Sequence, residues 1–550
     1  MDRKISDNAR IRKLLIANRG EVALRIMRTC MEMGIMSVAI YEKPDAASFF
    51  VRAASEAILI GDGPIKDYLN ISKIIQAAKQ SGADAIHPGY GFLSENPEFA
   101  AACEKAGIIF IGPRSEVLKS MGDKVIARQI AERAGVPTVP GLGPLPSGDE
   151  GLQAALLFAK QVGYPIMLKA VSGGGGRGIR KVKEESEMRV QIPLAEEEAQ
   201  SAFGDKSLYL EKCIEDPRHI EIQILADKRG NIVHLGSRDC SIQRRHQKIL
   251  EVAPASLPAD TMQKIYEAAL AVAKAADYTN AGTVEFLVDR KTNEFWFMEI
   301  NARLQVEHTI TEELTGIDII RQQIWIAEGD VLDLPPARIQ SIGRAIQVRI
   351  NAEDPGNNFM PEGGRIVEAY QAPGGPGVRL DGIVYPGYRI PSEYDSLMVK
   401  LTVRGYDWDQ TVNRLQRALR GFMFFGPKTT IPLYLNICDE PDFRREDFST
   451  NYVDTHPGIF IFEAPVLKSK EVVNDQVDKG EVRSPVKGVV KNIFVEEGED
   501  VVEGDVLMTM ESMKMICSIY ADMSGQVDSI PLQPGDPVDF NGLLITLKRM

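Results

Sequence analysis

Cysteine is scarce, and the six cysteines do not form the closely spaced pairs that metal sites and dense disulfide frameworks use. A reducing cytoplasm is therefore the expected location. Long apolar runs are missing, and residues 1–7 are polar rather than the start of a signal peptide. We therefore expect no membrane-spanning segment. Basic residues do not predominate either, because the net charge of −13 argues against nucleic-acid binding as the main function.

What remains is an ordinary globular composition, with 44% hydrophobic and 26% charged residues. The 550 residues are enough for roughly three or four domains. Within residues 11–125, apolar runs alternate with helical patterns, which predicts a parallel, doubly wound α/β sheet. The loop 87–96 follows one strand at its carboxyl end, where such sheets bind ligands, but its composition also fits a structural turn.

A glycine run follows the predicted strand 166–169. Glycine lets backbone N–H groups approach phosphate oxygens without a Cβ in the way. The run is not a Walker motif, since no Gly-Lys-Ser/Thr follows. We expect a phosphate-contacting loop, with a flexible linker as the alternative. Its residues are Gly173, Gly174, Gly175 and Gly176.

Two alternating segments, 283–289 and 294–301, are typical of a β-hairpin. A turn centred on Thr292 would place Glu285 opposite Glu299, and opposed residues point to the same face. Asn301 lies two residues further along and shares that face. Two carboxylates and an amide oxygen suit a hard divalent cation such as Mg²⁺. The alternative is two solvated glutamates on an outer face, although close unpaired carboxylates repel each other.

Basic residues are dense in the segments 238–248, 303–307 and 349–354. Their density near the acidic hairpin predicts an anion site beside a metal–nucleotide site. A charge-balanced solvated surface is the alternative. In an earlier strand, Glu211 and Lys212 form an acidic–basic edge that could hydrogen-bond an adenine.

An internal repeat predicts a second, pseudo-symmetric β domain near the C-terminus. Gly488 corresponds to Gly525 and Leu507 to Leu544, both with an offset of 37 residues (525 − 488 and 544 − 507). Lys514 lies at the junction of the two halves, in Glu-Ser-Met-Lys-Met. The segment resembles the biotin carrier (biotinyl/lipoyl) domain, with a serine where that family has alanine. The resemblance implies that a biotin protein ligase joins biotin to Lys514.

Residues from about 11 to 455 resemble the biotin carboxylase component of biotin-dependent carboxylases, an ATP-grasp enzyme. The motifs that carry the resemblance are 87–96, 121–124, 173–176, 238–248, 299–308 and 349–354. The resemblance implies both α/β and α+β parts, followed by an all-β domain. The implied domains are an N-terminal α/β domain (11–125), a lid (126–215), a core with a C-terminal domain (216–460), a linker (461–481) and a carrier (482–549).

The resemblance also implies the roles of individual residues. Glu307 would be the general base that deprotonates bicarbonate, and Arg349 would stabilise the biotin enolate. The implied nucleotide contacts are Lys124, Lys169, the glycine run, Glu211, Lys212, His219, Gln243 and His246. The implied bicarbonate contacts are Lys248, Arg303, Gln305 and Val306, with Lys248 and Arg303 also catalytic. The implied ligands of Mg²⁺ or Mn²⁺ are Glu285, Glu299 and Asn301.

These patterns predict the α subunit of a biotin-dependent carboxylase, which carboxylates biotin on its own carrier domain with ATP and bicarbonate. A carboxyltransferase would be a separate subunit, and we expect a homodimer or higher oligomer with no nucleic-acid or membrane partner. Acetyl-CoA or propionyl-CoA is the expected carboxyl acceptor, with pyruvate as the alternative. Two further alternatives are a non-carboxylating ATP-grasp ligase and an inactive scaffold that carries a lipoyl-like domain.

Overall fold

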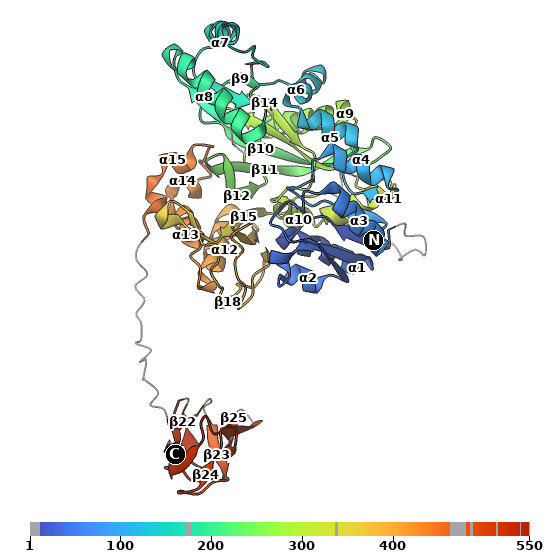
Figure 1. Ribbon diagram of the computed structural model, residues 1–550. Coiled ribbons are helices and arrows are strands. Elements are labelled where there is room, and N and C mark those ends of the chain that lie inside the picture. The colour runs from blue at the N-terminus through green and yellow to red at the C-terminus, as the bar shows by residue number, and fades with distance from the viewer. Residues whose placement is uncertain are drawn as a thin grey trace. The chain divides into compact units, whose positions relative to one another are not determined.

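The chain forms two compact units in this computed structural model, Met1–Phe462 and Glu463–Met550 (Figure 1). The structure describes residues 11–171, 179–335, 339–462, 480–484, 488–512, 515–539 and 541–548. A search of these residues finds no helix with the length and apolar character needed to span a bilayer. The predictions for Gly173, Gly174, Gly175, Gly176 and Lys514 lie outside the described residues.

The first unit contains a five-stranded parallel sheet, as the sequence predicts. The strand order is β3-β2-β1-β4-β5, so the order reverses beside β1, as in doubly wound folds. Helix α1 ends at Gly34, whose φ of 70° forms a left-handed cap. The elements are β1 (Lys13–Ile16), α1 (Gly20–Met33), β2 (Met36–Glu42), α2 (Phe49–Ala53), β3 (Glu56–Gly61), α3 (Ile71–Ser81), β4 (Ala85–His87), α4 (Pro97–Lys105) and β5 (Ile109–Phe110).

A separate four-stranded antiparallel sheet, in the order β6-β9-β7-β8, follows two short helices. Strand β7 alternates buried with half-buried residues, because one face packs against helices α7 and α8. The elements are α5 (Ser115–Gly122), α6 (Lys124–Arg133), β6 (Gly141–Leu142), α7 (Asp149–Val162), β7 (Ile166–Ala170), β8 (Ile179–Val182), α8 (Glu185–Phe203) and β9 (Leu208–Lys212).

An eight-stranded antiparallel sheet is the main structural element of the first unit, in the order β14-β13-β10-β11-β12-β15-β20-β19. It runs continuously through the region that the sequence assigns to both core and C-terminal domain. The predicted hairpin is β13 and β14, with Glu285 directly opposite Glu299. The strands are β10 (Arg218–Ala226), β11 (Ile232–Arg244), β12 (Gln247–Ala253), β13 (Asn280–Val288), β14 (Phe295–Asn301), β15 (Arg344–Asn351), β19 (Val378–Gly382) and β20 (Leu397–Gly405).

Helices and short ribbons cover this sheet. The helices are α9 (Ala259–Ala275), α10 (His308–Thr315), α11 (Ile319–Glu328), α12 (Trp408–Arg420), α13 (Ile431–Asp439), α14 (Pro441–Arg444) and α15 (Tyr452–Thr455). The ribbons are β16 (Glu353–Asp354) with β17 (Met360–Pro361), and β18 (Ala369–Gln371) with β21 (Met423–Phe425). Single 3₁₀ turns lie at Lys43–Asp45, Pro355–Asn357 and Pro457–Phe460.

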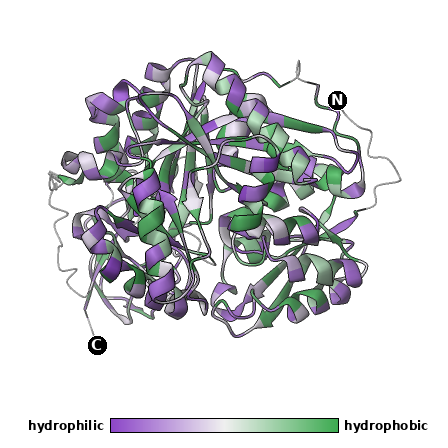
Figure 2. Cartoon of the chain, turned by 90° about the horizontal axis from the view of Figure 1, so that it is seen from above, coloured by the Kyte–Doolittle hydropathy of each residue, from purple (hydrophilic) through white to green (hydrophobic). Residues whose placement is uncertain are grey.

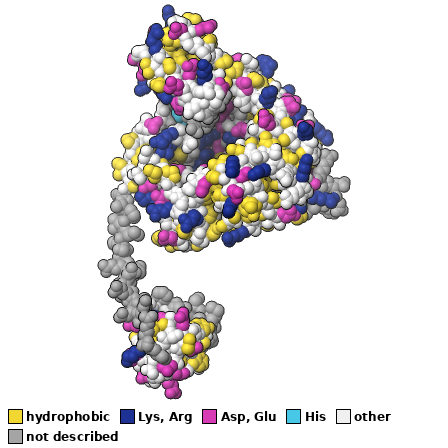
Figure 3. All heavy atoms as spheres, viewed as in Figure 1, with side chains coloured by type: hydrophobic (Ala, Val, Ile, Leu, Met, Phe, Trp, Pro, Cys, Tyr) yellow, Lys and Arg dark blue, Asp and Glu magenta, His cyan; other side chains and the backbone are white. Residues whose placement is uncertain are grey.

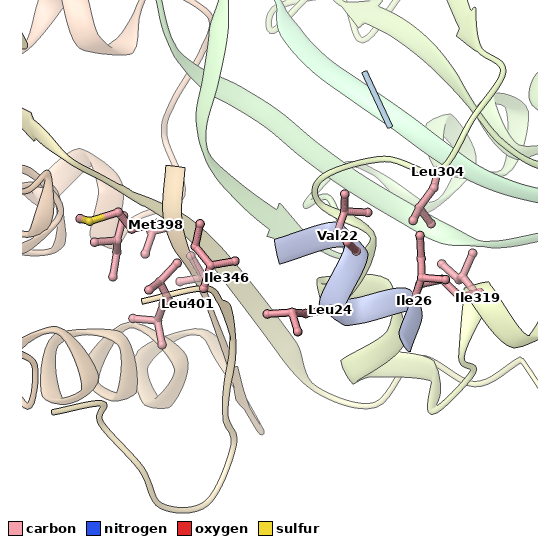
Figure 4. Packing of buried hydrophobic residues seen from close by; sticks show 14 of the residues in the cluster. Val22, Leu24, Ile26, Leu304, Ile319, Ile346, Met398 and Leu401 are labelled. Carbon is pink, nitrogen blue, oxygen red and sulfur yellow. The ribbon is translucent and has the colours of Figure 1, made fainter. Parts of the chain in front are cut away.

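The largest hydrophobic core joins the parallel sheet to the eight-stranded sheet. Helix α1 lies between them, with Val22 and Ile26 near Leu304, and with Ile346 on the other side (Figure 4). Figure 2 shows hydrophobic strands inside the unit and hydrophilic residues on outer helix faces. Because burial of apolar area is the main stabilising contribution, α1 holds the two sheets in a fixed arrangement around the site described below.

The second unit contains two four-stranded sheets, in the orders β22-β29-β27-β24 and β26-β25-β23-β28. A shift of 37 residues places β22, β29, β27 and β24 onto β26, β25, β23 and β28. The predicted repeat is therefore a pseudo-twofold fold in which each sheet takes strands from both halves. The strands are β22 (Glu481–Arg483), β23 (Gly488–Ile493), β24 (Asp500–Val501), β25 (Val506–Ser512), β26 (Met515–Tyr520), β27 (Gly525–Ser529), β28 (Pro537–Val538) and β29 (Leu543–Lys548).

Candidate active site

The ammonium group of Lys248, on β12, lies among three buried carboxylates. It donates hydrogen bonds to Glu221 Oε2 at 2.7 Å, Glu285 Oε1 at 2.9 Å and Glu307 Oε1 at 2.8 Å. Burial opposes the charge of Lys248, but the three glutamates raise its pKa well above the ordinary value. The cation and its carboxylates come from β10, β12 and β13 of the eight-stranded sheet and from the start of α10, so the sheet fixes their spacing.

Glu307 is held in place by a second cation. Its Oε2 accepts a hydrogen bond from an Arg349 NH2 group at 3.1 Å, and its side chain is 1% exposed. Burial alone would raise the pKa of Glu307, but the charges of Lys248 and Arg349 lower it below the ordinary value. Glu307 is therefore ionised at neutral pH and can accept a proton from a group placed beside it.

Three other buried charged residues complete this cluster, and the sequence analysis did not single them out for a role. Arg238 donates to Glu221 and also to Thr311 Oγ1 at 2.9 Å. Glu251 accepts from Arg349 at 2.5 Å. The signal in the sequence is a glutamate inside an otherwise apolar strand, as in His-Ile-Glu-Ile and Ile-Leu-Glu-Val. Glu221 and Glu251 are both fully buried, and buried carboxylates are rare unless they are paired.

The three predicted metal ligands lie together beside Lys248. Asn301 Nδ2 donates to Glu285 Oε1 at 2.7 Å and lies 3.5 Å from Glu299 Oε1. Burial and the neighbouring charge of Glu285 raise the pKa of Glu299. A divalent cation between the Glu285 and Glu299 oxygens would offset that repulsion, and carboxylate oxygens are ligands that Mg²⁺ takes. Asn301 would add an amide oxygen after rotation of its amide, because its Oδ1 accepts from Arg303 in this arrangement. The residues therefore fit a magnesium ion.

His219 and Gln243 extend the same hydrogen-bonded network. His219 Nε2 lies 2.6 Å from Glu285 Oε2, and Gln243 Nε2 donates to His219 Nδ1 at 2.8 Å. The carboxylate only accepts, so His219 carries its proton on Nε2. The predicted nucleotide contact His246 is exposed at the tip of the β11–β12 hairpin, with a positive φ of 62°.

Three of the four predicted bicarbonate residues, Arg303, Gln305 and Val306, lie in one loop between β14 and α10. Arg303 Nε donates to Glu95 Oε2 at 2.8 Å, and its NH2 group donates to Asn301 Oδ1 at 3.1 Å. Gln305 is buried, and its Nε2 has no hydrogen-bond partner within the described part of the chain. A buried unpaired donor costs free energy unless a ligand accepts from it. This loop therefore places hydrogen-bond donors beside Lys248. The side chain of Val306 is apolar, so this residue can contribute only its main-chain groups.

Two of the predicted nucleotide contacts, Lys124 and Glu211, line a cavity of about 250 Å³ between the four-stranded sheet and β14, together with Tyr209 and Phe297 among others. Lys169 forms an ion pair with Glu211. Burial lowers the pKa of Lys124. Figure 3 shows the molecule hollowed below the lobe of α7 and α8, with basic and acidic side chains inside the hollow. Aromatic side chains beside the ammonium groups of Lys124 and Lys169 suit a nucleotide, which has an aromatic base and phosphates.

Lys212, another predicted nucleotide contact, lies apart from the ion pair of Lys169 and Glu211. Successive strand residues point to opposite faces, so Lys212 points away from Glu211. Its ammonium donates to the carbonyls of Gly163 at 3.1 Å and Tyr164 at 2.9 Å. This side chain joins β9 to the start of β7 rather than facing the cavity.

The loop 87–96 supports the site from the parallel sheet. Glu95 holds Arg303, and Asn18 Nδ2 donates to the carbonyls of Pro88 at 2.7 Å and Tyr90 at 2.8 Å. At the start of the loop, His87 is fully buried between Gln323 and the Gly89 N–H. The loop is therefore a hydrogen-bonded turn that also orients Arg303, and contact between this loop and a ligand stays a prediction.

The burial of His87 predicts a loss of stability in acid. Burial lowers the pKa of His87 to about 4, against 6.5 in the unfolded chain. The unfolded state therefore binds this proton first, and stability falls as the pH drops from 6.5 towards 4. Between pH 7 and pH 5 the wild type should lose about 2 kcal/mol more than His87→Gln. Urea unfolding at the two pH values measures this difference, and equal losses would contradict it.

Four family models cover most of the chain. They are the biotin carboxylase N-terminal domain (residues 10–118), the carbamoyl-phosphate synthase L chain ATP-binding domain (123–334), the biotin carboxylase C-terminal domain (347–455) and the biotin-requiring enzyme model (480–547).

Solved structures share the fold of the first unit. The biotin carboxylase domain of 2-oxoglutarate carboxylase from Hydrogenobacter thermophilus, in complex with MgADP and bicarbonate, matches with a TM-score of 0.80 and 46% identity. The match covers 82% of this chain and 99% of that chain. Biotin carboxylase from Campylobacter jejuni matches with a TM-score of 0.79 and 44% identity, over 82% of this chain and all of that chain.

Some curated relatives are matched over nearly their whole length, and others are much longer than this chain. Pyruvate carboxylase of Bacillus subtilis is 50% identical over 82% of this chain, which spans about 40% of the length of that relative. Biotin carboxylase 1 of the same organism is 47% identical over 81% of this chain and 99% of its own length. The relative is thus matched over nearly its whole length, and in this chain the matching region is followed by a segment that fits the biotin-requiring enzyme model. The chain therefore belongs to the biotin carboxylase family of biotin-dependent carboxylases.

Proposed function

We propose that this chain carboxylates biotin with ATP and bicarbonate, and that the biotin is carried on Lys514. The observation that carries the proposal is the position of Glu307, an ionised base held between Lys248 and Arg349. A base alone is not specific, but a base in a loop of anion donors beside a magnesium site suits proton removal from bicarbonate. The alternatives of another ATP-grasp ligase or an inactive scaffold do not account for this combination.

In the proposed mechanism, bicarbonate accepts hydrogen bonds from Lys248, Arg303, Gln305 and the Val306 main chain. Glu307 accepts the bicarbonate proton, which makes the remaining oxygen a better nucleophile toward the γ-phosphate of ATP. Glu285, Glu299 and Asn301 would hold Mg²⁺, which supplies positive charge to the transferring phosphoryl group. Lys124, Lys169 and Glu211 would contact the nucleotide, and His219 with Gln243 would orient Glu285.

Arg349 has a separate proposed role. Its guanidinium lies against Glu307 and Glu251, close to the bicarbonate donors. Phosphoryl transfer to bicarbonate would release ADP and give carboxyphosphate, which would break down to CO₂ and phosphate. The phosphate would take the proton of the biotin ureido nitrogen, this nitrogen would bond to CO₂, and Arg349 would hold the negative charge that develops on the ureido carbonyl oxygen. Burial opposes the charge of this arginine, but the two carboxylates raise its pKa above the ordinary value, so it stays charged. Water exclusion by the buried cluster would limit hydrolysis of the activated intermediate.

The test of the function is ADP release from the full chain with free biotin. We expect release to depend on bicarbonate, magnesium and biotin together. ADP release that ignores bicarbonate, with formation of an amide from an added acid and amine, would favour the other ATP-grasp ligase. Absence of any ATP cleavage would favour the inactive scaffold.

The carboxyl acceptor and partner are also proposed. We expect a separate carboxyltransferase subunit, and a homodimer formed through the first unit. The sequence analysis favours an acyl-CoA such as acetyl-CoA or propionyl-CoA. A 2-oxo acid such as pyruvate is the second candidate, because the small subunit of 2-oxoglutarate carboxylase from Hydrogenobacter thermophilus is 48% identical over 82% of this chain and 94% of its own length. Affinity capture on the biotin, followed by transfer of labelled bicarbonate to both acceptor classes, distinguishes them.

A further inference from the structure

A buried ammonium lies directly beneath the loop that carries Gln305, Val306 and Glu307. Lys400, on β20, has no exposed surface, and its Nζ donates to the Val306 carbonyl at 3.0 Å. In the sheet, Lys400 is paired with Arg349 on β15. Opposed residues of an antiparallel pair point to the same face. Two neighbouring cations therefore reach one loop, Arg349 through the Glu307 side chain and Lys400 through the Val306 main chain.

The preceding carbonyl of the loop has its own donor. His308 is fully buried, and its Nδ1 lies 2.7 Å from the Gln305 carbonyl oxygen. Burial, together with the charges of Lys400 and other cations nearby, lowers the pKa of His308 well below the ordinary value. The ring is therefore neutral, and since a carbonyl only accepts, the single proton is on Nδ1.

Because His308 and Lys400 hold the Gln305 and Val306 carbonyls, they also fix the directions of two main-chain N–H groups. A trans peptide is planar, so the N–H of each unit points away from its C=O. The Val306 and Glu307 N–H groups therefore point away from His308 and Lys400. No hydrogen bond from the Val306 N–H is found within the part of the chain that the structure describes. This donor is available to an anion in the loop.

The carboxylate of Glu21, in the N-terminal α/β region, balances the charge of Lys400. Glu21 Oε1, in the first turn of α1, lies 3.0 Å from Lys400 Nζ, and the Tyr90 hydroxyl donates to the same carboxylate. The Tyr90 ring centroid is 5.6 Å from the ammonium, within cation–π range. Glu21 follows β1 and Tyr90 follows β4, so this ion pair connects the edge of the parallel sheet where the strand order reverses to the loop.

We propose that Lys400 and His308 are positioning residues for bicarbonate, which act by fixing the main-chain donors of the loop from beneath. The inference rests on the proposed function of that loop. Neither residue touches the reacting atoms. Hydrogen bonds to a charged group contribute more than neutral ones, so loss of Lys400 should weaken bicarbonate binding more than loss of His308.

The test measures KM for bicarbonate, KM for ATP and kcat in the full chain with free biotin. Lys400→Met alone would leave Glu21 buried and unpaired, so it is combined with Glu21→Gln, which leaves a neutral pair. The double variant should raise KM for bicarbonate about 10- to 100-fold, while KM for ATP stays near the wild-type value. Lys228→Met is a control for the loss of a lysine elsewhere, since Lys228 is exposed and donates to the Ala327 carbonyl at 2.8 Å outside the site.

A second pair of variants keeps the test decisive if the double variant does not fold. Asparagine places its amide nitrogen near the position of a histidine Nδ1, so His308→Asn keeps the donor that His308→Leu removes. His308→Leu should raise KM for bicarbonate about 3- to 10-fold, and His308→Asn should raise it less.

Three results would overturn the inference. One is an unchanged KM for bicarbonate in a folded double variant, and another is an equal effect of the two His308 variants. The third is a wild-type protein without bicarbonate-dependent ATP cleavage. That last result would overturn the proposed function as well, whereas the first two leave it intact.

Discussion

Glu307→Gln should lower the rate of bicarbonate-dependent ATP cleavage by about 10²–10⁴-fold, the usual contribution of a general base. Glutamine has nearly the same shape as glutamate, and its single carbonyl oxygen can still accept from either Lys248 or Arg349, but it cannot take a proton from bicarbonate. The protein should still fold, because Lys248 keeps Glu221 and Glu285, and Arg349 keeps Glu251. The measurement is ADP release with free biotin, alongside nucleotide binding, which should not change.

Glu446→Gln is the matched control for this prediction. Glu446 pairs with Arg344, on the same strand as Arg349, with a distance of 3.0 Å between Arg344 NH1 and Glu446 Oε1. Both side chains are partly buried, so the control also removes one carboxylate charge from a sheet ion pair. ADP release should stay at the wild-type level. Activity retained in Glu307→Gln, or lost equally in the control, would exclude Glu307 as the base.

The predicted metal ligands show how far a local pattern can predict. Alternation and a turn centred on Thr292 place Glu285 opposite Glu299, and the structure has this pair. The pairs nearer the turn, such as Phe286 with Phe297, follow a register that would place Met298 opposite Glu285. The observed pair therefore depends on a register shift just after Glu285, which alternation alone does not reveal.

The buried partners of the site show what a local pattern cannot predict. Lys248 contacts Glu221 and Glu307, which are 27 and 59 residues away along the chain. Lys400 reaches Val306 across 94 residues. Such contacts depend on strand order in the eight-stranded sheet, and single-strand periodicity carries no information on that order. A charged residue in an apolar strand indicates only that some partner exists.

The repeat near the C-terminus, in contrast, predicts how strands that are far apart in the sequence are arranged. A constant offset predicts that equivalent strands occupy equivalent positions, and the two sheets follow that rule strand by strand. It did not predict that each sheet would combine strands from both halves. Only the paired registers, such as Val506 opposite Tyr520 and Asp500 opposite Gln526, reveal this exchange.

Lys514→Arg should abolish carboxylation of the chain's own carrier domain while free-biotin activity remains. Ser512 and Met515 are opposite each other on β25 and β26, so residues 513–514 connect the two halves of the repeat. An amide to biotin requires an amine that can lose its proton, and a guanidinium does not do so in proteins. Intact-mass analysis should therefore show one biotin on the wild type and none on the variant.

Lys491→Arg is the control for this prediction, because Lys491 is another exposed lysine of the second unit, in an ion pair with Glu511. It should keep its biotin and its carboxylation. A biotin mass that persists in Lys514→Arg would place the modification elsewhere and remove the carrier assignment. If biotin is lost but labelled carboxylate still accumulates on the protein, the carboxyl group is not carried by biotin on Lys514. The two assays together therefore separate attachment of biotin from its carboxylation, since the first unit can be assayed on free biotin alone.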